Sequence, residues 1–370
     1  MPHPGVHFDP SNKGDSVRRN EFALLCISML IALAIAEFAV RVFLALPAKA
    51  IAMTTLPSIV GEQGDVVRYK VNTQLVEVAV DQDGIIYSAA FDTNNLGLID
   101  DQDYGSSEAD QKIALLGDSF TAGYHGGSPW ILEFRKRLDE STSANNLGVA
   151  GTGIREFEKR LKWFANELEL DKVFVLVISS DFYRPEWYPV IRDRKLWFCP
   201  SATESEQCLV SSNPAFHDLD AGWTNTELLS EAQSILNAGS VTSRRGLRLF
   251  DTSISAFRSM RETPAMRLTY PEVRANLAAL DRLVKWFGVE KVVVLHLPEK
   301  HEVARNGYDI DLRQYASEQS IQYTQLQEVC PFNSSMYLDR DPHPNTLGYT
   351  HLVDCLAGLA LPPAGSSRAE

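Results

Sequence analysis

The chain has 370 residues, of which 45% are hydrophobic and 22% are charged. These fractions are ordinary for a globular protein and fit one large or two modest domains. Acidic residues outnumber basic ones by 48 to 35, which gives a formal net charge of −13. This balance argues against nucleic acid as a partner and against a polybasic membrane patch, because both need clustered lysine and arginine.

The N-terminal segment carries a targeting signal. Residues 1–20 are polar and predict a cytoplasmic tail, whereas residues 21–46 are mostly apolar and long enough to span a bilayer. Arg18 and Arg19 precede this run and place the N-terminus inside. We expect a transmembrane signal anchor; the alternative is a signal peptide cleaved between residues 48 and 52. Both put the body of the protein outside the cytoplasm, in the periplasm or at the cell surface.

Residues 47–110 predict a linker followed by a small β region next to the membrane. The stretch 66–80 is rich in β-branched residues that partly alternate with polar ones, and a turn signal follows at 81–84. No chemistry can be attached to this region from its residues.

From residue 111 the chain alternates between short apolar runs and amphipathic segments. The apolar runs predict buried strands, and the amphipathic segments predict helices. The main strands are expected at 113–116, 173–178 and 292–295, and the main helices at 157–168, 270–287 and 345–359. This alternation predicts an α/β domain over 111–361 with a mostly parallel sheet covered on both faces. Its pattern lapses over about 183–265, which predicts an insertion that either roofs the active edge or is a structural excursion. Residues 362–370 predict a disordered tail.

Four cysteines lie outside the apolar N-terminal segment. An even number is compatible with two disulfides in an oxidising compartment. The spacing suggests Cys199 with Cys208 and Cys330 with Cys355; four buried free thiols are the alternative.

Ser119 is the candidate nucleophile. It follows the apolar run 113–116 and the pair Gly117-Asp118. A serine beside a glycine at the end of a buried strand is lifted to the open edge of a sheet, where a nucleophile needs exposure and nearby backbone N–H groups. The same tripeptide also occurs as an ordinary capping turn.

His343 is the candidate base, within Asp341-Pro-His-Pro-Asn345. Pro344 suits the start of the last helix, so the segment is a rigid loop that presents an acid and a histidine. Asp341 can fix the tautomer of His343 and leave its other nitrogen for the serine, with Asp339 as the alternative orienter. His125 follows the serine turn and might line the site. The remaining histidines lack zinc-ligand spacing, so neither a metal nor a cofactor is expected.

These motifs resemble those of the SGNH (GDSL-type) hydrolases. The matching segments are Gly117-Asp-Ser-Phe120, Asn146-Leu-Gly-Val-Ala-Gly151 and Asp341-Pro-His343, in the family's order, over about residues 112–360. The anchored layout is similar to that of many bacterial members. The resemblance implies a three-layer α/β/α, flavodoxin-like fold acting on O-acyl esters.

The resemblance also implies roles for individual residues. Ser119 would be the nucleophile, His343 the base and Asp341 its orienter, and the N–H groups of Ser119 and Gly151 would hold the oxyanion. The motif residues Asp118, Asn146 and Asp181 would help to bind substrate. The family's third motif carries an asparagine whose side chain also holds the oxyanion; here Ser180 stands in that position and offers a single, shorter donor.

The sequence therefore predicts an anchored, extracytoplasmic esterase or deacetylase that acts on an acylated small molecule or, more specifically, on an acylated glycan or cell-envelope polymer. An O-acyltransferase with the same three residues is one alternative. A non-catalytic glycan-binding or scaffold protein on the hydrolase fold is another, motivated by Ser180 and by the aromatic-rich insertion.

Overall fold

The computed structural model describes most of the chain from residue 51 to residue 360. The described residues are 22, 24–33, 35, 51–54, 59–60, 66–81, 83–105, 108–126, 130–192, 195–199, 208–210, 224–242 and 264–360. The chain divides into two units, one of Met1–Lys49 with Gly239–Glu262 and one of Ala50–Ala238 with Thr263–Glu370.

The described part of the N-terminal segment is helical at 24–33. Most of the predicted anchor, residues 21–46, lies outside the described residues, as do the tails 1–20 and 362–370. Among the helices that are described, none combines the length and the apolar character needed to cross a membrane.

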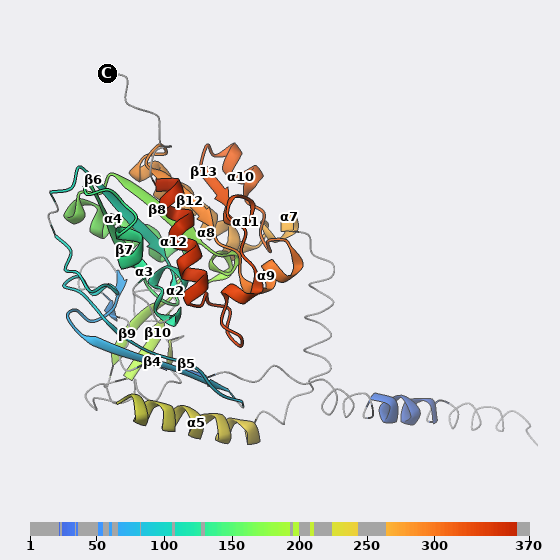
Figure 1. Ribbon diagram of the computed structural model, residues 1–370. Coiled ribbons are helices and arrows are strands. Elements are labelled where there is room, and N and C mark those ends of the chain that lie inside the picture. The colour runs from blue at the N-terminus through green and yellow to red at the C-terminus, as the bar shows by residue number, and fades with distance from the viewer. Residues whose placement is uncertain are drawn as a thin grey trace, which may run out of the picture. The chain divides into compact units, whose positions relative to one another are not determined.

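A five-stranded parallel sheet forms the centre of the second unit (Figure 1). Its spatial order is β13-β12-β8-β6-β7, and every neighbouring pair is parallel. The strands are β6 (Gln111–Gly117), β7 (Thr142–Gly148), β8 (Lys172–Val177), β12 (Val292–His296) and β13 (Gln322–Gln325). Counted along the chain, this order is 2-1-3-4-5, the flavodoxin-like doubly wound arrangement. The predicted α/β class with a parallel sheet is confirmed.

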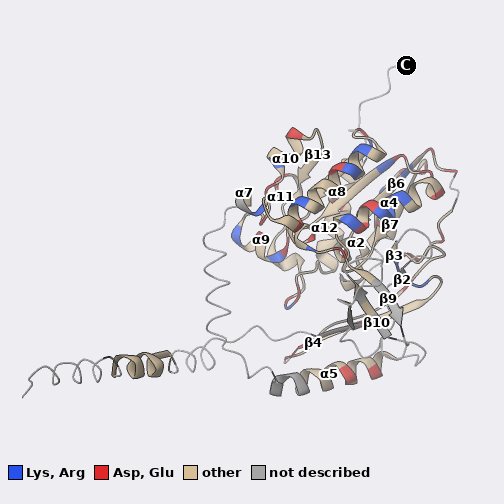
Figure 2. Ribbon diagram, turned by 180° about the vertical axis from the view of Figure 1, so that it is seen from behind, with Lys and Arg blue, Asp and Glu red and all other residues tan. Residues whose placement is uncertain are grey.

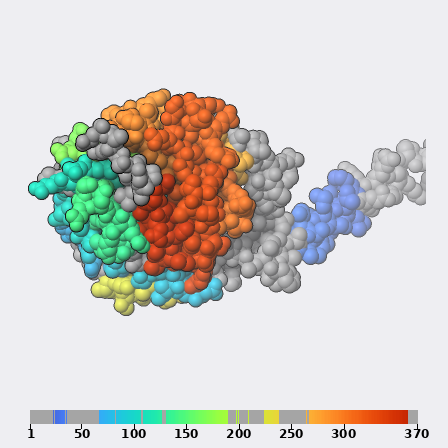
Figure 3. Space-filling view, turned by 45° about the horizontal axis from the view of Figure 1, so that its top comes forward, coloured from blue at the N-terminus to red at the C-terminus, as the bar shows by residue number. Residues whose placement is uncertain are grey.

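Helices cover both faces of this sheet. One face carries α4 (Ile154–Leu168) and α8 (Pro271–Phe287), and the other carries α3 (Trp130–Arg135) and α12 (Thr346–Ala360). Figure 2 shows charged residues along α4 and α8, where Arg282 pairs with Glu158 at 2.7 Å. Figures 1 and 3 show α12 beside α3 on the opposite face.

Alternation within the strands explains the two apolar cores. In β6, Ala114 and Leu116 pack with the residues of α4 and α8, whereas Ile113 and Leu115 pack with those of α3 and α12. All four side chains are fully buried. A strand with both faces buried is a continuous apolar run, which is why these strands could be found in the sequence.

The remaining helical segments are short and connect the strands or flank them. They are α2 (Ser119–Ala122), η1 (Tyr124–Gly126), η2 (Ser179–Tyr183), α7 (Pro264–Arg267), α9 (Lys300–Arg305), α10 (Arg313–Glu318), α11 (Leu326–Val329) and η5 (Ser334–Met336).

The predicted small β region is an antiparallel sheet with the order β1-β4-β5. It consists of β1 (Ile51–Thr54), β4 (Gln74–Asp81) and β5 (Gly84–Asp92). Leu75 and Ala89 belong to the main apolar core, so the β4–β5 hairpin packs directly on the central domain. The helix α5 (Asn225–Thr242) packs on Val78 and Val80 of β4 through Leu228, Ala232 and Leu236.

The insertion is described only in part. Within it, β9 (Tyr188–Arg192), β10 (Lys195–Cys199) and β11 (Leu209–Val210) form a small antiparallel sheet. Outside the insertion, before the β4–β5 hairpin, β2 (Ile59–Val60) pairs with β3 (Val67–Arg68). Residues 211–223 and 243–263 lie outside the described residues, so the two alternatives for the insertion both stay predictions. Cys199 is bonded to Cys208, and Cys330 to Cys355.

Candidate active site

Ser119 lies where the first central strand ends. β6 stops at Gly117, and Ser119 is the first residue of α2. Only glycine fits at 117, since a Cβ there would lie 2.0 Å from Thr121 Oγ1. Asp118 caps the short helix by accepting a backbone N–H of its first turn at 2.9 Å. This edge of the sheet, between the carboxyl ends of β6 and β8, is where the strand order reverses and where such folds bind ligands.

A hydrogen-bonded chain joins Ser119 to His343 and Asp341. His343 Nε2 lies 2.8 Å from Ser119 Oγ, and His343 Nδ1 lies 2.5 Å from Asp341 Oδ1. Asp341 Oδ1 also accepts the backbone N–H of His343 at 2.9 Å. In the described structure no hydrogen bond joins the side chains of Asp339 and His343, so of the two candidate orienting acids only Asp341 contacts the histidine ring.

The charge state of Asp341 follows from its surroundings. Burial alone would raise the pKa of this carboxyl, but the hydrogen bonds and charge of His343 outweigh it and hold the pKa below its ordinary value. Asp341 is therefore ionised at neutral pH and holds the proton of His343 on Nδ1. Nε2 is then free to accept the hydroxyl proton of Ser119.

The loop that carries His343 is fixed by its neighbours. Asn345 donates to the carbonyl oxygen of Tyr337 at 3.0 Å and accepts the N–H of Gly348, also at 3.0 Å, at the start of α12. Lys300 donates to the carbonyl oxygen of Leu338 at 2.5 Å. The Asp-Pro-His-Pro-Asn segment is thus a helix-capping turn as well as the carrier of the base.

Two backbone N–H groups, those of Ser119 and Gly151, are the predicted holders of an oxyanion. Within the described part of the chain, the N–H groups of Ser119 and Gly151 donate no hydrogen bond. Gly151 is exposed and has a φ of +74°, a left-handed conformation that favours glycine. The predicted role of these two groups stays a prediction that this geometry permits.

Ser180 is arranged differently from the prediction. Its hydroxyl donates to Glu299 Oε1 at 3.2 Å, and its backbone N–H donates to Glu299 Oε2 at 3.1 Å. Burial, followed by the charge of Glu302, raises the pKa of Glu299. A hydroxyl has one proton to donate. With that proton directed to Glu299, Ser180 does not serve as an oxyanion donor in this structure.

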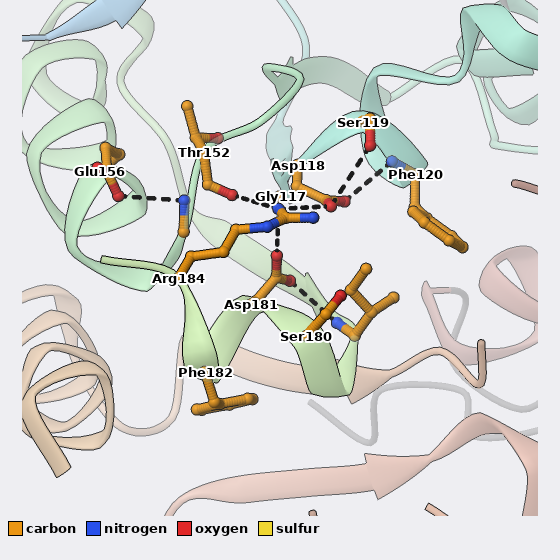
Figure 4. A network of polar contacts seen from close by, with 12 residues as sticks. Gly117, Asp118, Ser119, Phe120, Thr152, Glu156, Ser180, Asp181, Phe182 and Arg184 are labelled. Atoms are coloured by element: carbon orange, nitrogen blue, oxygen red, sulfur yellow. Dashed lines mark hydrogen bonds and ion pairs between the residues drawn. The ribbon is translucent and has the colours of Figure 1, made fainter. Parts of the chain in front are cut away.

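Arg184, which the sequence did not single out, ties the site together (Figure 4). Its Nη1 donates to Asp118 Oδ2 at 2.8 Å, to Asp181 Oδ1 at 2.7 Å and to the carbonyl oxygen of Thr152 at 2.6 Å. One guanidinium therefore links the serine turn, the segment after β8 and the loop that contains Gly151.

Burial and neighbouring charges shift the pKa of Asp181 and of Arg184. Burial, and then the charge of Asp118, raises the pKa of Asp181 well above its ordinary value, against the opposing effect of Arg184. Burial would lower the pKa of Arg184, but Asp181 and Asp118 raise it. Both acids are almost fully buried and face this arginine. They support the site from behind, and the prediction that they contact substrate gains nothing from this placement.

Comparisons with known proteins find similarity at the level of solved structures. No family model and no curated protein matches the chain. A lipase/acylhydrolase from Enterococcus faecalis is 15% identical, with a TM-score of 0.33, over 67% of this chain and 94% of that one. A member of the lipolytic protein G-D-S-L family from Veillonella parvula is 13% identical, with a TM-score of 0.33, over 67% and 97%. A GDSL-like lipase from Bacteroides thetaiotaomicron is 11% identical, with a TM-score of 0.31, over 68% and 89%.

Asn146 was predicted to bind substrate, and the structure gives it another part. Its Oδ1 accepts the N–H of Gly148 at 2.9 Å, and its Nδ2 donates to the carbonyl oxygens of Ala122 at 3.3 Å and Ile99 at 3.4 Å. The side chain is buried. Both ends of the amide are thus used to fasten the turn after β7 to its neighbours, and this placement corrects the prediction.

A cleft of about 460 Å³ lies at Asp341, two residues before His343. Asp341 lines it together with Lys300, His301, Ser334, Asp339 and Arg340. Polar side chains and the apolar atoms of Ala304 and Pro342 share its lining, and its volume is in the range of small-molecule sites.

Two groups of residues in the described part of the chain have the donor types of a metal site. Cys330 and Cys355, near His351, are bonded to each other. In the other group, the Glu299 carboxylate accepts from Ser180, and Glu302 accepts from the backbone of Glu299 and Asp309. These donors are already engaged, so we assign no metal to either group.

Proposed function

We propose that the protein is a serine hydrolase that cleaves O-acyl esters with Ser119 as nucleophile, His343 as base and Asp341 as orienting acid. The observation that carries the proposal is the continuous hydrogen-bonded chain through these three side chains. Ser119 and His343 are 224 positions apart in sequence, yet their reacting atoms lie 2.8 Å apart at the ligand-binding edge of the sheet. An incidental capping turn would not need this alignment.

The first half of the proposed reaction forms an acyl-enzyme. Ser119 Oγ attacks the ester carbonyl carbon while its proton passes to His343 Nε2. The carbonyl oxygen becomes an oxyanion, which accepts hydrogen bonds from the N–H groups of Ser119 and Gly151. The imidazolium of His343, stabilised by Asp341, then gives its proton to the leaving alcohol as the C–O bond breaks.

The second half releases the acid. His343 takes a proton from water, the hydroxide attacks the acyl carbon, and the same N–H groups hold the second oxyanion. Collapse breaks the bond to Ser119 Oγ, which recovers its proton from His343. Because Ser180 donates to Glu299, the oxyanion has two backbone donors in this scheme rather than three.

The proposed location is outside the cytoplasm, with the chain anchored by its N-terminal helix. Two features support this proposal. Disulfides such as Cys199–Cys208 and Cys330–Cys355 persist in oxidising compartments. The helical residues 24–33 expose large apolar side chains, Leu24 and Leu30 among them, as a lipid-facing segment would.

The proposed substrate is an acylated glycan or cell-envelope polymer. The cleft beside Asp341 supports this choice, because Lys300, Ser334 and Asp339 offer polar groups to a hydroxylated ligand.

The proposal is tested with the full-length chain purified in detergent. We expect a fluorophosphonate probe to label it and an aryl acetate to be hydrolysed, and both activities to be lost in Ser119→Ala. A well-folded wild-type protein that is neither labelled nor active would contradict the proposal and favour a non-catalytic binding protein. Adding an oligosaccharide acceptor separates hydrolysis from transfer, since a transferase would move the acetyl group to sugar faster than to water.

A further inference from the structure

A second histidine packs flat against the base. The rings of His125 and His343 are stacked, with centroids 3.6 Å apart and planes 8° from parallel. His125 is 5% exposed, and in the described structure its Nδ1 has no hydrogen-bond partner. Its Nε2 lies 3.4 Å from Glu77 Oε1. Because His125 contacts the ring of the base and not the Ser119 hydroxyl, it is placed to act on His343.

Glu77 reaches His125 from β4 of the accessory hairpin. The same carboxylate accepts the hydroxyl of Tyr87, from β5, at 2.5 Å and the hydroxyl of Tyr124, from η1, at 2.8 Å. Two hydroxyl donors and the His125 ring nitrogen at 3.4 Å therefore converge on one largely buried carboxylate. A buried acid surrounded in this way is a built feature, since each unsatisfied polar group would be costly there.

The charges of this pair follow from the contacts. Burial alone would raise the pKa of Glu77, but His125, Tyr87 and Tyr124 outweigh it and lower the pKa. Burial, and then the charge of His343, lowers the pKa of His125. The pair is thus an ionised carboxylate and a neutral imidazole, with His125 Nε2 facing Glu77 Oε1. It carries one negative charge behind the ring of the base.

The hairpin also holds the other side of the catalytic loop. Arg340, which precedes Asp341, forms an ion pair with Asp81 of β4 and donates to the carbonyl oxygen of Ile85 at 2.9 Å. This contact is independent of His125. The β4–β5 hairpin therefore touches the loop both through the ring of His343 and through the residue next to Asp341.

We propose that the β4–β5 hairpin is a positioning element of the active site, in which Glu77 acts through His125 to align His343 and to stabilise the imidazolium that forms on it. The inference rests on the proposed ester hydrolysis. The flat contact leaves the His343 ring little freedom to turn away from the line between Asp341 and Ser119. The negative charge of Glu77 lowers the energy of the cation that appears when Ser119 gives up its proton.

The pH dependence separates this role from mere support. The groups that face His125 are Glu77 from β4, Tyr87 from β5, Tyr124 from its own segment, and Asp341 and His343 from the catalytic loop. Among them Glu77 is the anion that Glu77→Gln removes while keeping the size of the side chain. Without that anion the imidazolium that forms on His343 during the reaction loses an opposite charge on the side that His125 covers.

The first experiment records kcat/KM for an aryl acetate against pH for wild type and Glu77→Gln, with full-length protein. We expect the plateau to fall about tenfold and the acid limb to move down by roughly half a pH unit, as for loss of a nearby opposite charge. Gln74→Ala is the control on the same strand, because Gln74 is exposed and, among the described residues, its side chain hydrogen-bonds to Asp92 alone, at 3.4 Å. It should match wild type in both respects.

The second experiment separates ring packing from charge. His125→Ala removes the stacked ring, and His125→Phe keeps a flat ring; we expect His125→Phe to recover most of the activity that His125→Ala loses. Arg340→Gln breaks only the loop tether, so it should lower kcat about threefold and leave the acid limb in place.

The outcomes are distinguishable. An inactive, unlabelled wild type would contradict the proposed hydrolysis itself. An active wild type with an unshifted acid limb in Glu77→Gln, or with wild-type rates in both His125→Ala and Arg340→Gln, would overturn the inference and leave the hydrolase intact. If Glu77→Gln does not fold, as judged by circular dichroism, the other two variants decide the question.

Discussion

The two halves of the candidate site are held in different ways. The serine half is local: Gly117, Asp118 and Ser119 follow one buried strand, and the turn is fixed by the space at Gly117 and by the cap from Asp118. The base half is held from a distance, because the loop of His343 is fastened by Lys300, by the hairpin and by the ring of His125. A nucleophile can thus be built from a few consecutive residues, whereas a base that must meet it depends on contacts that the whole fold supplies.

Breaking the base half at its centre should have the largest effect. Asp341→Asn keeps the shape of the side chain but no longer fixes the proton on His343 Nδ1, so we expect kcat to fall by about 10⁴-fold. The fall is measured with an aryl acetate at pH 7, beside the unfolding midpoint of the variant. Asp339→Asn is the matched control, since Asp339 was the alternative orienter and should stay within about twofold of wild type by the same reasoning. If kcat instead fell by orders of magnitude in Asp339→Asn and little in Asp341→Asn, Asp339 would be the acid that orients His343.

Breaking the serine half should cost stability as well as rate. Arg184→Gln leaves Asp118 and Asp181 buried without their common cation, so we expect the free energy of unfolding to fall by about 3 kcal/mol. We also expect kcat to fall about tenfold, because Thr152 and Asp118 lose the group that joins their loops.

Denaturant unfolding checks the stability change in Arg184→Gln. Arg137→Gln serves as the control, since its pair with Asp354 is more than half exposed on both sides and should contribute less than about 1 kcal/mol. Equal losses of unfolding free energy in the two variants would show that the ion pairs of Arg184 contribute no more than an exposed surface pair. The serine half would then not depend on Arg184 for its stability.

The smallest change in kcat is expected at Ser180. This variant tests whether the serine half contains a side-chain oxyanion donor. We expect Ser180→Ala to lower kcat less than about threefold, whereas losing an oxyanion donor costs on the order of a hundredfold or more. The reason is that the Ser180 hydroxyl donates to Glu299. Single-turnover measurements of acyl-enzyme formation test the step concerned. A hundredfold loss there would mean that the hydroxyl turns to the substrate during the reaction.

The same division explains what could be predicted from the sequence. The central strands are continuous apolar runs, and Ser119, Asp341 and His343 stand in short motifs, so the strands and the meeting of these three side chains could be predicted from local pattern. Arg184 could not, because its partner Asp118 is 66 positions away and nothing in its own neighbourhood marks it. Glu77 could not either, since an acid in a β-rich stretch gives no sign of the histidine that it will meet.

Motif position alone was also misleading in one place. Asn146 stands in a motif but bonds to its own turn at Gly148 and to the backbone beside it. Asparagine side chains commonly accept a backbone N–H two residues on, and a motif does not tell this use from a ligand contact. The inward orientation of Asn146 could be recognised only from its acceptors, the carbonyl oxygens of Ala122 and Ile99, which are distant in sequence.

The bond between Cys330 and Cys355 spans 25 positions, and Asp341 and His343 lie inside the span. The segment that carries Asp341 and His343 is therefore a loop closed by a disulfide. Closing a ring of this size removes conformations from the unfolded ensemble and is worth roughly 3 kcal/mol in the chain-entropy model. The loop of His343 depends most on distant contacts, yet the disulfide limits the conformations that it can adopt when those contacts are lost. After a local opening, His343 therefore samples few conformations before it returns to Ser119.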